Sequence, residues 1–493
     1  MLILGCITVV AAGLRFWGLG HQSFWYDEGL TVMELHHPLG RMLGYLPRVE
    51  SNPPVYYTLA WAWVRLFGYG EAALRSLSAL AGIAMVPAIY GVGAKLVSRR
   101  AGLVAATLAA FNPLLIWYSQ EARSYSLLVL FATLAWLAFA HARLPNPSTR
   151  WLVGWSLAAS FTLGTHYYGV LAVVPQAVWL LVVHRRNRKV WLALAVVAAA
   201  GGALLPLALS QQHLGNWIST FPLDRRLSQM APQAAIGTGA PARGWLKLAG
   251  ALAVLLAGAL LVLRADRSER RGALVAGALA VAGFLLALGL VLAGIDNLIT
   301  RNVIVVLIPL IVLVAGGLGA CRAGLLGSLG VATLCAIGLI ATIGVQADWK
   351  LQRADWRELA HTLEANRVAR GGRAVLVQED AGLYPLAIYL HRLRFLPLRG
   401  SRVRELDVIA AGGGTRGAWF CWWGAACNLV PSQLYSSIHV RGFRPAGPVL
   451  QVKQFSILRL RPAHGIRLTP DGVARALRNT PLRVYFLYVQ PRG

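Results

Sequence analysis

The feature that most constrains this chain is a succession of hydrophobic blocks, most of them about 17 to 25 residues long. Such a block crosses the hydrocarbon core of a bilayer, about 30 Å thick, as a helix. Only 13% of the residues are charged and the mean hydropathy is +0.57, which excludes an ordinary soluble domain. The sequence therefore predicts a polytopic α-helical membrane protein with about eleven transmembrane helices. The blocks lie near Leu2–Leu19, Ala73–Leu96, Ala101–Tyr118, Ser126–Ala142, Trp151–Thr165, Tyr168–His184, Val190–Ser210, Trp245–Leu263, Ala273–Ala293, Val303–Cys321 and Leu325–Val345.

Basic residues in the connections predict the orientation, because short cytoplasmic loops retain Lys and Arg. Every second connection is basic, which places the N-terminus in the cytoplasm. The first block lacks a basic start, so we interpret it as a retained helix rather than a cleaved secretory signal. The outer loops then include residues 21–72, with juxtamembrane helices, and 211–244, a gating loop, while residues 1–345 form one transmembrane module. The basic groups are Lys95/Arg99/Arg100, Arg143/Arg150, Arg185/Arg186/Arg188/Lys189, Arg264/Arg267/Arg270/Arg271 and Arg322.

The formal net charge of +28 would suit a nucleic-acid partner in a soluble protein. Here the cytoplasmic loops account for much of it, and no nucleic-acid-binding motif stands out. We therefore expect no nucleic acid among the partners.

Residues 346–493 have a different hydropathy pattern, in which short hydrophobic runs alternate with polar turns. Because the helix count is odd, this tail is exported. We expect a small periplasmic or extracellular α/β domain. The predicted strands are Ala374–Gln378, Phe395–Leu398, Ala418–Trp423, Leu450–Gln454, Ser456–Leu460 and Val484–Val489, and the predicted helices are Trp356–Asn366 and Tyr384–His391. Cys421 and Cys427 lie in this domain, where an oxidising compartment would allow a disulfide between them.

Ionisable residues near a membrane are costly to keep, so a cluster of them predicts a functional site. In this chain they gather on the outer side. They are Asp27 and Glu28 in WYDEG, Glu50 in ESNPPVYY, Arg75, Glu121 and Arg123 in YSQEARSY, His166 beside Tyr167 and Tyr168, and Arg301.

The order of these motifs resembles that of a known family. WYDEG after the first helix, SNPPVYY in the first loop and SQEARSYSL before the fourth helix are similar to the dolichyl-phosphate-mannose protein mannosyltransferases and the bacterial aminoarabinose transferases. The resemblance implies a GT-C fold and an inverting glycosyltransferase whose active site faces the outer side of the membrane. It also implies a polyprenyl-phosphate-linked sugar as donor.

The residue types suit this reaction. The resemblance makes Asp27 the catalytic base that takes the acceptor's proton, with Glu28 and Glu121 as the other catalytic carboxylates. Negative charge grows on the leaving phosphate, and fixed guanidinium groups stabilise that charge. We expect Arg123, Arg301 and Arg75 to bind the donor phosphate.

The other polar and aromatic residues near the outer face are candidates for binding the substrates. No cofactor is required by this reading, although Glu50 and His166 could together hold a divalent metal. Residues 30–46 could lie along the surface as an amphipathic helix that roofs the site. The substrate-binding candidates are Glu50, Tyr56, Tyr57, Gln120, Tyr125, His166 and Tyr167.

Three other functions remain open from the sequence, and one of them is a degenerate family member whose exported domain only binds glycan. A lipid or glycan transporter or flippase would also be polytopic, but it should show paired halves with polar residues at the midplane. An oligosaccharide ligase would use a lipid pyrophosphate donor. The expected partners are the lipid-linked sugar, membrane lipids and an acceptor glycan, lipid or protein. The Ala-, Gly-, Leu- and Arg-rich composition favours the cytoplasmic membrane of a bacterium with a GC-rich genome.

Overall fold

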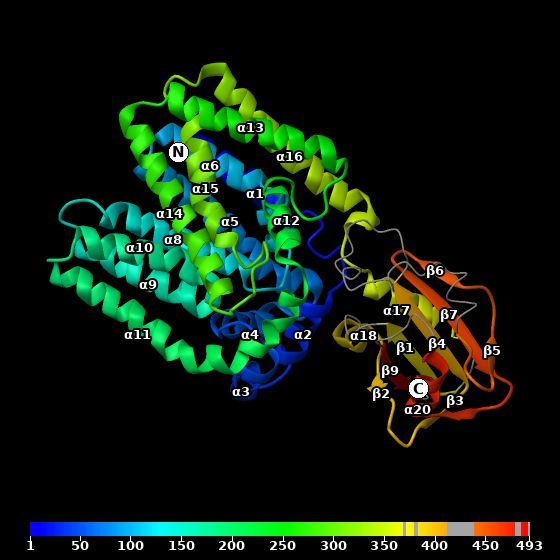
Figure 1. The fold of residues 1–493 in the computed structure, drawn as a ribbon. Coiled ribbons are helices and arrows are strands. Elements are labelled where there is room, and N and C mark those ends of the chain that lie inside the picture. The colour runs from blue at the N-terminus through cyan, green and yellow to red at the C-terminus, as the bar shows by residue number, and fades with distance from the viewer. Residues whose placement is uncertain (368–370, 379–382, 412–437, 479–484, 492–493) are drawn as a thin grey trace. The chain divides into compact units, whose positions relative to one another are not determined.

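The computed structural model describes residues 1–367, 371–378, 383–411, 438–478 and 485–491 (Figure 1). The chain forms two compact units. The first contains Met1–Leu19 and Glu34–Gly344, and the second contains Gly20–Met33 and Val345–Gly493. The predicted division at residue 345 did not anticipate that residues 20–33 pack with the C-terminal unit.

The first unit is built from helices, and each predicted hydrophobic block contains one. Among the described residues, six helices are long and apolar enough to cross a membrane, or seven if the bent pair α6 and α7 forms one span. The chain is thus a multi-pass α-helical membrane protein. Its helices are α1 (Leu2–Phe16), α3 (Leu39–Val49), α4 (Val55–Phe67), α5 (Glu71–Leu96), α6 (Arg99–Phe111), α7 (Pro113–Ser119), α8 (Tyr125–Ala142), α9 (Thr149–Thr165), η1 (Tyr167–Gly169), α10 (Val170–Val183), α11 (Arg188–Gln211), η2 (Gln212–Thr220), α12 (Leu223–Ile236), α13 (Arg243–Leu263), α14 (Arg267–Leu292), η3 (Ile304–Val306), α15 (Leu307–Leu318) and α16 (Gly324–Ala347).

The break between α6 and α7 shows how the unit satisfies its backbone. Pro113 begins α7 and has no N–H, so the helix bends by 58° there. Buried Arg15 of α1 donates to the carbonyls of Ala109 and Ala110 at 3.1 and 3.0 Å. In an unbroken helix, the backbone N–H of residue 113 would donate to the carbonyl of Ala109. A buried guanidinium therefore replaces the lost helical hydrogen bond.

Two outer stretches differ from their predictions: the single amphipathic helix expected at residues 30–46 is two helices, and the gating loop expected at residues 211–244 contains helices. Residues 30–46 are divided between α2 (Tyr26–Leu35) and α3. Pro38, between the two helices, is the residue directly before the first residue of α3. Residues 211–244 carry η2 and α12 rather than an irregular loop. The two terminal nitrogens of Arg226 in α12 donate to the two carboxylate oxygens of Asp296 at 2.7 and 2.6 Å. This bidentate pair connects α12 to the segment after α14.

The second unit contains a mixed sheet in the order β2-β9-β1-β4-β7-β5, with β6 also paired to β7 (Figure 1). Among the described strands of this sheet, β1 and β4 run parallel and the other pairs are antiparallel. The strands are β1 (Arg373–Gln378), β2 (Arg394–Phe395), β4 (Glu405–Ala411), β5 (Phe443–Pro445), β6 (Leu450–Val452), β7 (Phe455–Pro462) and β9 (Tyr485–Gln490), and a separate pair joins β3 (Ser401–Val403) to β8 (Ile466–Leu468).

Alternate residues of the sheet face two cores, as strand geometry requires. Val375 and Val377 pack with α17 (Trp356–Ala365) and α18 (Leu383–Tyr389). Ala374 and Leu376 pack on the other side with α20 (Pro470–Leu477). The unit is therefore an α/β domain with helices on both faces of the sheet. The predicted strand 418–423 and the predicted disulfide of Cys421 and Cys427 lie outside the described residues.

Candidate functional site

The predicted site residues are divided between the two units. Asp27 and Glu28 belong to the second unit, and the other predicted residues belong to the first.

The WYDEG motif begins α2 of the second unit, and Asp27 and Glu28 occupy the first helical turn. Carboxylates are favoured there by the helix dipole. Asp27 is partly exposed, whereas Glu28 is buried. The Asp27 carbonyl accepts a hydrogen bond from the Thr31 hydroxyl at 3.0 Å, within the same helix.

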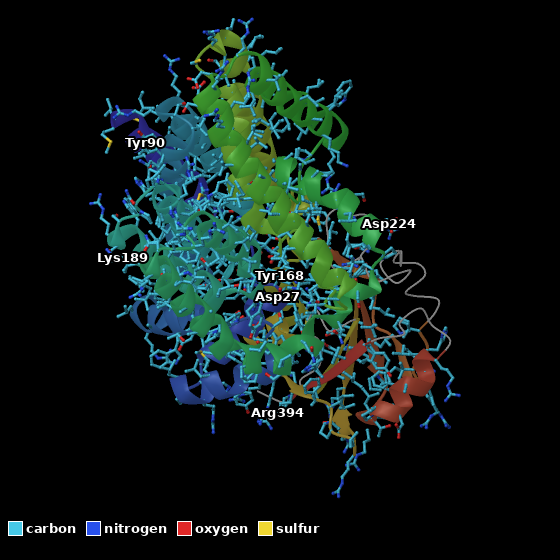
Figure 2. All side chains as sticks on the ribbon, turned by 60° about the vertical axis from the view of Figure 1, so that its left-hand side comes forward. Asp27, Tyr90, Tyr168, Lys189, Asp224 and Arg394 are labelled. Carbon is cyan, nitrogen blue, oxygen red and sulfur yellow. The ribbon has the colours of Figure 1, made fainter. Side chains whose placement is uncertain are left out.

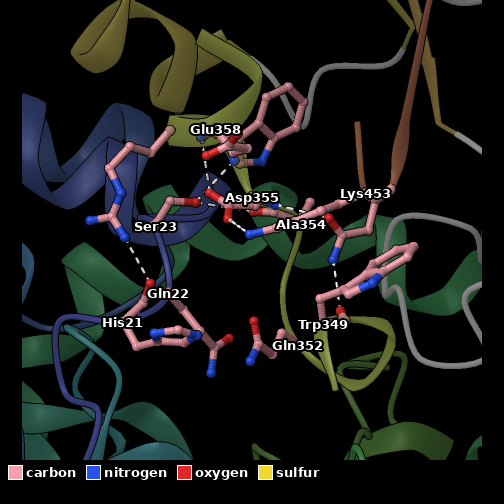
Figure 3. Close-up of polar contacts among 12 residues, drawn as sticks. His21, Gln22, Ser23, Trp349, Gln352, Ala354, Asp355, Glu358 and Lys453 are labelled. Atoms are coloured by element: carbon pink, nitrogen blue, oxygen red, sulfur yellow. Dashed lines mark hydrogen bonds and ion pairs between the residues drawn. The ribbon is translucent and has the colours of Figure 1, made fainter. Parts of the chain in front are cut away.

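The segment before this motif is bonded to the ADWREL stretch of the tail, which includes residues 354–359 (Figure 3). The Ser23 hydroxyl donates to the Ala354 carbonyl at 3.1 Å and accepts from the Trp356 N–H at 3.0 Å. Arg357 donates to the His21 carbonyl at 2.7 Å. These bonds place the WYDEG helix on the α/β domain.

Gly29 makes the closest approach in this motif. A Cβ there would lie 2.9 Å from the Cβ of Tyr384 and 3.0 Å from the backbone nitrogen of Pro385. The rings of Tyr26 and Tyr384 are 5.1 Å apart. The glycine thus lets α2 pack against α18.

The QEARS turn of the first unit connects α7 to α8. Gln120 donates to the carbonyls of Leu14, Arg15 and Trp17 at the end of α1. These bonds give the buried side-chain amide of Gln120 a structural role that requires no ligand. Glu121 is 1% exposed, and its carbonyl accepts from the Arg123 N–H at 2.8 Å, which tightens the turn.

The side chain of Arg123 forms the central contact of the first unit. Its two terminal nitrogens donate to the two oxygens of Glu50 at 2.5 and 2.9 Å. Both side chains are at most 5% exposed. The Ser78 hydroxyl of α5 also donates to the Arg123 carbonyl at 3.3 Å. A bidentate ion pair that is shielded from solvent in this way is strong and directional.

The PPVYY motif starts α4 beside this pair. Pro54 precedes the first helical residue, and both Tyr56 and Tyr57 are fully buried. Their rings meet edge to face with centroids 5.3 Å apart. The Arg123 guanidinium carbon lies 5.9 Å from the centre of the Tyr57 ring, which suits a cation–π contact.

Arg301 lies beside two aromatic rings. Its guanidinium carbon lies 5.9 Å from the Tyr125 ring centre and 5.6 Å from that of Trp217. The His166 ring is 5.7 Å from Tyr125. Burial, together with Arg301 and Arg123, lowers the pKa of His166 below its usual value, so this ring is neutral at pH 7.

Two other predicted residues have structural partners. Arg75 is 1% exposed and donates to the Leu19 carbonyl at 3.1 Å. The Tyr167 hydroxyl donates to Gln211 at 2.5 Å, and the Gln211 amide donates to the Leu46 carbonyl at 2.8 Å. The first bond joins α5 to the segment after α1, and the other two join η1 and α11 to α3. Tyr168, next along the chain, is buried among the helices, whereas Lys189 lies at the surface (Figure 2).

Sequence reasoning missed Glu34, which closes α2 and belongs to the first unit. Glu34 is 4% exposed, and neither carboxyl oxygen has a hydrogen-bond partner among the described residues. The charges of Glu50 and Arg123 act on its carboxyl group in opposite directions. The only sequence signal was an acidic residue in the otherwise apolar run LTVMEL.

One group of three side chains in the described part of the chain could hold a metal: Asp266, Glu269 and Cys321. Hydrogen bonds already explain this group, because Asp266 and Glu269 form a capping box for α14 and Glu269 accepts from the Cys321 N–H. The predicted metal ligands are not part of it. Each oxygen of Glu50 accepts a hydrogen bond from Arg123, so a metal there would share this carboxylate with the guanidinium or displace it.

A groove of about 560 Å³ lies between α10 and α14. Its lining includes Val174, Val178, Trp179 and Ala282, and no ionisable residue contributes to it. The groove offers contact to hydrocarbon and no chemistry.

Comparison with known proteins supports the resemblance seen in the sequence. Residues 51–208 match the family described as dolichyl-phosphate-mannose-protein mannosyltransferase. No curated protein sequence matches the chain. The crystal structure of ArnT from Cupriavidus metallidurans bound to undecaprenyl phosphate is similar at 13% identity, with a TM-score of 0.55, over 92% of this chain and 97% of that chain.

Two further solved structures are similar over smaller shares. The S. cerevisiae protein O-mannosyltransferase Pmt1-Pmt2 complex bound to the sugar donor matches at 16% identity and a TM-score of 0.34, over 43% of this chain and 33% of that chain. The Archaeoglobus fulgidus oligosaccharyltransferase in complex with Zn and sulfate matches at 13% identity and a TM-score of 0.41, over 74% of this chain and 56% of that chain. The recognition made from the motifs is confirmed: this chain has the GT-C glycosyltransferase fold, and residues 51–208 carry the mannosyltransferase family's sequence pattern.

Proposed function

We propose that the protein transfers a sugar, with inversion, from a polyprenyl-phosphate carrier to an acceptor hydroxyl. The reaction takes place at the outer face of a bacterial cytoplasmic membrane, with the N-terminus in the cytoplasm and the α/β domain outside. The observation that carries the proposal is the buried Arg123–Glu50 pair, in a unit that shares its fold with an undecaprenyl-phosphate-bound protein.

The chemistry follows from the charges. As the glycosidic bond breaks, negative charge accumulates on the lipid phosphate, and a preorganised guanidinium stabilises it more than it stabilises the ground state. Arg123 takes this role, because Glu50 and the Tyr57 ring hold its fork in one orientation. Arg301, held by Tyr125 and Trp217, is the second cation.

Asp27 is the proposed base, which removes the acceptor proton as the oxygen attacks the sugar carbon. Its partial exposure leaves the carboxylate accessible to a hydroxyl. Glu28 and Glu121 are buried and suit a supporting role around the reacting groups. Arg75 and Gln120 are proposed to shape the site through their backbone partners rather than to bind the donor.

The test is transfer of labelled sugar by the purified protein from a panel of synthetic donors that includes both polyprenyl-phosphate and polyprenyl-pyrophosphate sugars. Asp27→Asn keeps the shape of the side chain but removes the base, so it should stay folded and lose about 10²-fold or more in rate. The matched control is Asp471→Asn, at an exposed position in the first turn of α20 of the same unit. It should react like the wild type.

The outcomes separate the functions that the sequence left open. Consumption of one donor by the wild type and not by Asp27→Asn supports the proposal, and the product names the acceptor. Consumption of only a pyrophosphate-linked donor would favour the oligosaccharide ligase. If no donor reacts, or if Asp27→Asn reacts at the wild-type rate, the proposal is wrong.

A further inference from the structure

The α/β domain carries a group of exposed arginines that the proposed reaction does not use. Arg402 in β3 and Arg404 directly after it flank the buried Val403, so their side chains leave the strand on the same, outward face (Figure 1). Arg467 of β8 is the direct partner of Arg402 across the strand pair, and it is exposed as well. These three residues are called the arginine ribbon.

The side chains of the arginine ribbon are packed together rather than spread into solvent. Arg402 Nε and Arg404 Cγ lie 3.2 and 3.5 Å from the point where a Cβ on Gly465 would stand. The Arg402 Nε also donates to the Gly465 carbonyl at 3.3 Å. The glycine thus leaves room for both arginine stems, and Arg467 adds a third cation at a cross-strand Cβ distance of about 5 Å.

Such an arrangement of like charges is unfavourable by itself. Cations directly opposite each other on paired strands repel and weaken the pairing. A second pair of this kind, Arg444 opposite Arg461, joins β5 to β7. The start of β5 is next to β8, because a Cβ on Gly442 would lie 2.6 Å from the Ile466 Cδ1. Two neighbouring strand pairs therefore each align an arginine with an arginine, and an anionic partner would remove this repulsion.

The acids of the domain do not neutralise the arginine ribbon. In the described part of the second unit, the ion pairs use Arg373, Arg459 and Lys453 as their cations, and none involves the ribbon. Glu405 and Asp407 are buried beside Arg459 of β7. The anions that would balance the ribbon must therefore come from another molecule.

The chemistry of the ribbon indicates what kind of molecule this is. A guanidinium group binds a carboxylate or a phosphate through two parallel hydrogen bonds, and several guanidinium groups in a row suit several anions in a row. Elements that bind a membrane surface place large apolar side chains beside their cations. Among the described residues after 345, the exposed large apolar side chains are Phe395 and Leu398, which lie outside the ribbon. A hydrophilic polyanion therefore fits better than a lipid surface.

We propose that the arginine ribbon binds an anionic glycan of the cell envelope through carboxylate or phosphodiester groups on successive sugars. The inference takes from the proposed function only the exported position of the α/β domain. It holds whether or not the bound glycan is also the acceptor of the transferred sugar.

The experiment measures binding of fluorescently labelled oligogalacturonate to the full-length protein in phosphatidylcholine nanodiscs, at increasing salt concentration. Parallel measurements use phosphodiester-linked oligomannose and neutral dextran of similar length. The wild type should bind at least one of the two anionic chains about tenfold or more tightly than dextran, and this affinity should fall as the salt concentration rises, because binding releases counterions. The chain that binds more tightly names the anionic group.

The double variant Arg402→Gln/Arg467→Gln removes the cross-strand pair and keeps polar side chains. It should weaken binding of the anionic chain about tenfold or more and make it less dependent on salt. Its thermal unfolding temperature should stay the same or rise, since the repulsion is relieved, whereas loss of a structural contact would lower it. Should the double variant not fold, Arg467→Gln is measured in its place. The control Lys350→Gln, at an exposed cation of η4 (Trp349–Leu351) in the same unit, should bind like the wild type.

Three results would each overturn the inference. The first is equal binding of dextran and of both anionic chains. The second is a folded double variant that binds the anionic chain as tightly as the wild type. The third is displacement of the labelled chain by soluble dihexanoylphosphatidylglycerol at a lower concentration of negative charge than by the unlabelled chain, which would make an anionic lipid the partner. Sugar transfer is measured separately, so each of these results leaves the proposed function standing.

Discussion

The Arg123–Glu50 pair should show strong energetic coupling in a double-mutant cycle. Its two nitrogen–oxygen distances are 2.5 and 2.9 Å, and the side chains are 5% and 2% exposed. Removing one partner of a buried pair leaves the other charge uncompensated, which costs about 3–5 kcal/mol of unfolding free energy. We expect this loss for Arg123→Met and for Glu50→Gln alone.

The double variant Arg123→Met/Glu50→Gln should lose much less than the sum, because neither charge remains. The coupling energy should be about 2–4 kcal/mol. The control is the Lys453–Asp355 pair of the second unit, whose lysine side chain is 34% exposed. Its coupling should stay below about 1 kcal/mol, as for surface ion pairs.

The assay is unfolding of the detergent-solubilised protein, followed by helix content for the first unit and by sheet signal for the second. If the two Arg123 and Glu50 changes add to within about 0.5 kcal/mol, the pair is not coupled and the reasoning about the site fails. A separate measurement of polyprenyl phosphodiester binding should show loss in the Arg123→Met variant, including in the double variant whose stability recovers.

Two further predictions concern the helix packing. Arg15→Met should lower the unfolding free energy by about 2–4 kcal/mol, since it leaves the carbonyls at the end of α6 unpaired. Adding Pro113→Ala should restore part of this loss by returning a backbone N–H. If the effects of the two substitutions are fully additive in the thermal unfolding of the wild type, the single variants and the double variant, this reasoning is wrong. Gly317→Ala would place a Cβ 1.9 Å from the Ala257 carbonyl oxygen and should cost about 1–3 kcal/mol, whereas Gly258→Ala meets nothing within 4 Å and should be neutral or slightly stabilising in the same assay.

The helical part of the fold could be predicted because its signal is local. A run of apolar residues long enough to span a bilayer is helical regardless of its neighbours, since every backbone group must be bonded within the segment. The bend at Pro113 is a local signal too. What could not be predicted is that Arg15 would serve the broken helix, because that contact joins residues 95 and 94 positions apart.

The tail was harder to predict from its pattern. The strand β4 carries Glu405 and Asp407, which are polar residues where a buried strand should be apolar. In the structure Arg459 of β7 lies 2.8 Å from Asp407, and Arg373 of β1 lies 3.6 Å from it. A buried acid next to arginines of other strands is compatible with a sheet, but the partners are known only once the strands are paired.

The sequence by itself determined that this chain crosses a membrane many times, that a short-strand domain follows, and that acids and arginines gather in ordered motifs. These properties depend on hydropathy, length and spacing, which are local. The tertiary structure decided which charges meet: it pairs Glu50 with Arg123, 73 positions apart, and buries Glu34 where no described residue donates a hydrogen bond to it. Burial and partner choice arise from contacts between distant segments, and they determine whether a carboxyl group is ionised, paired or available to hold a proton.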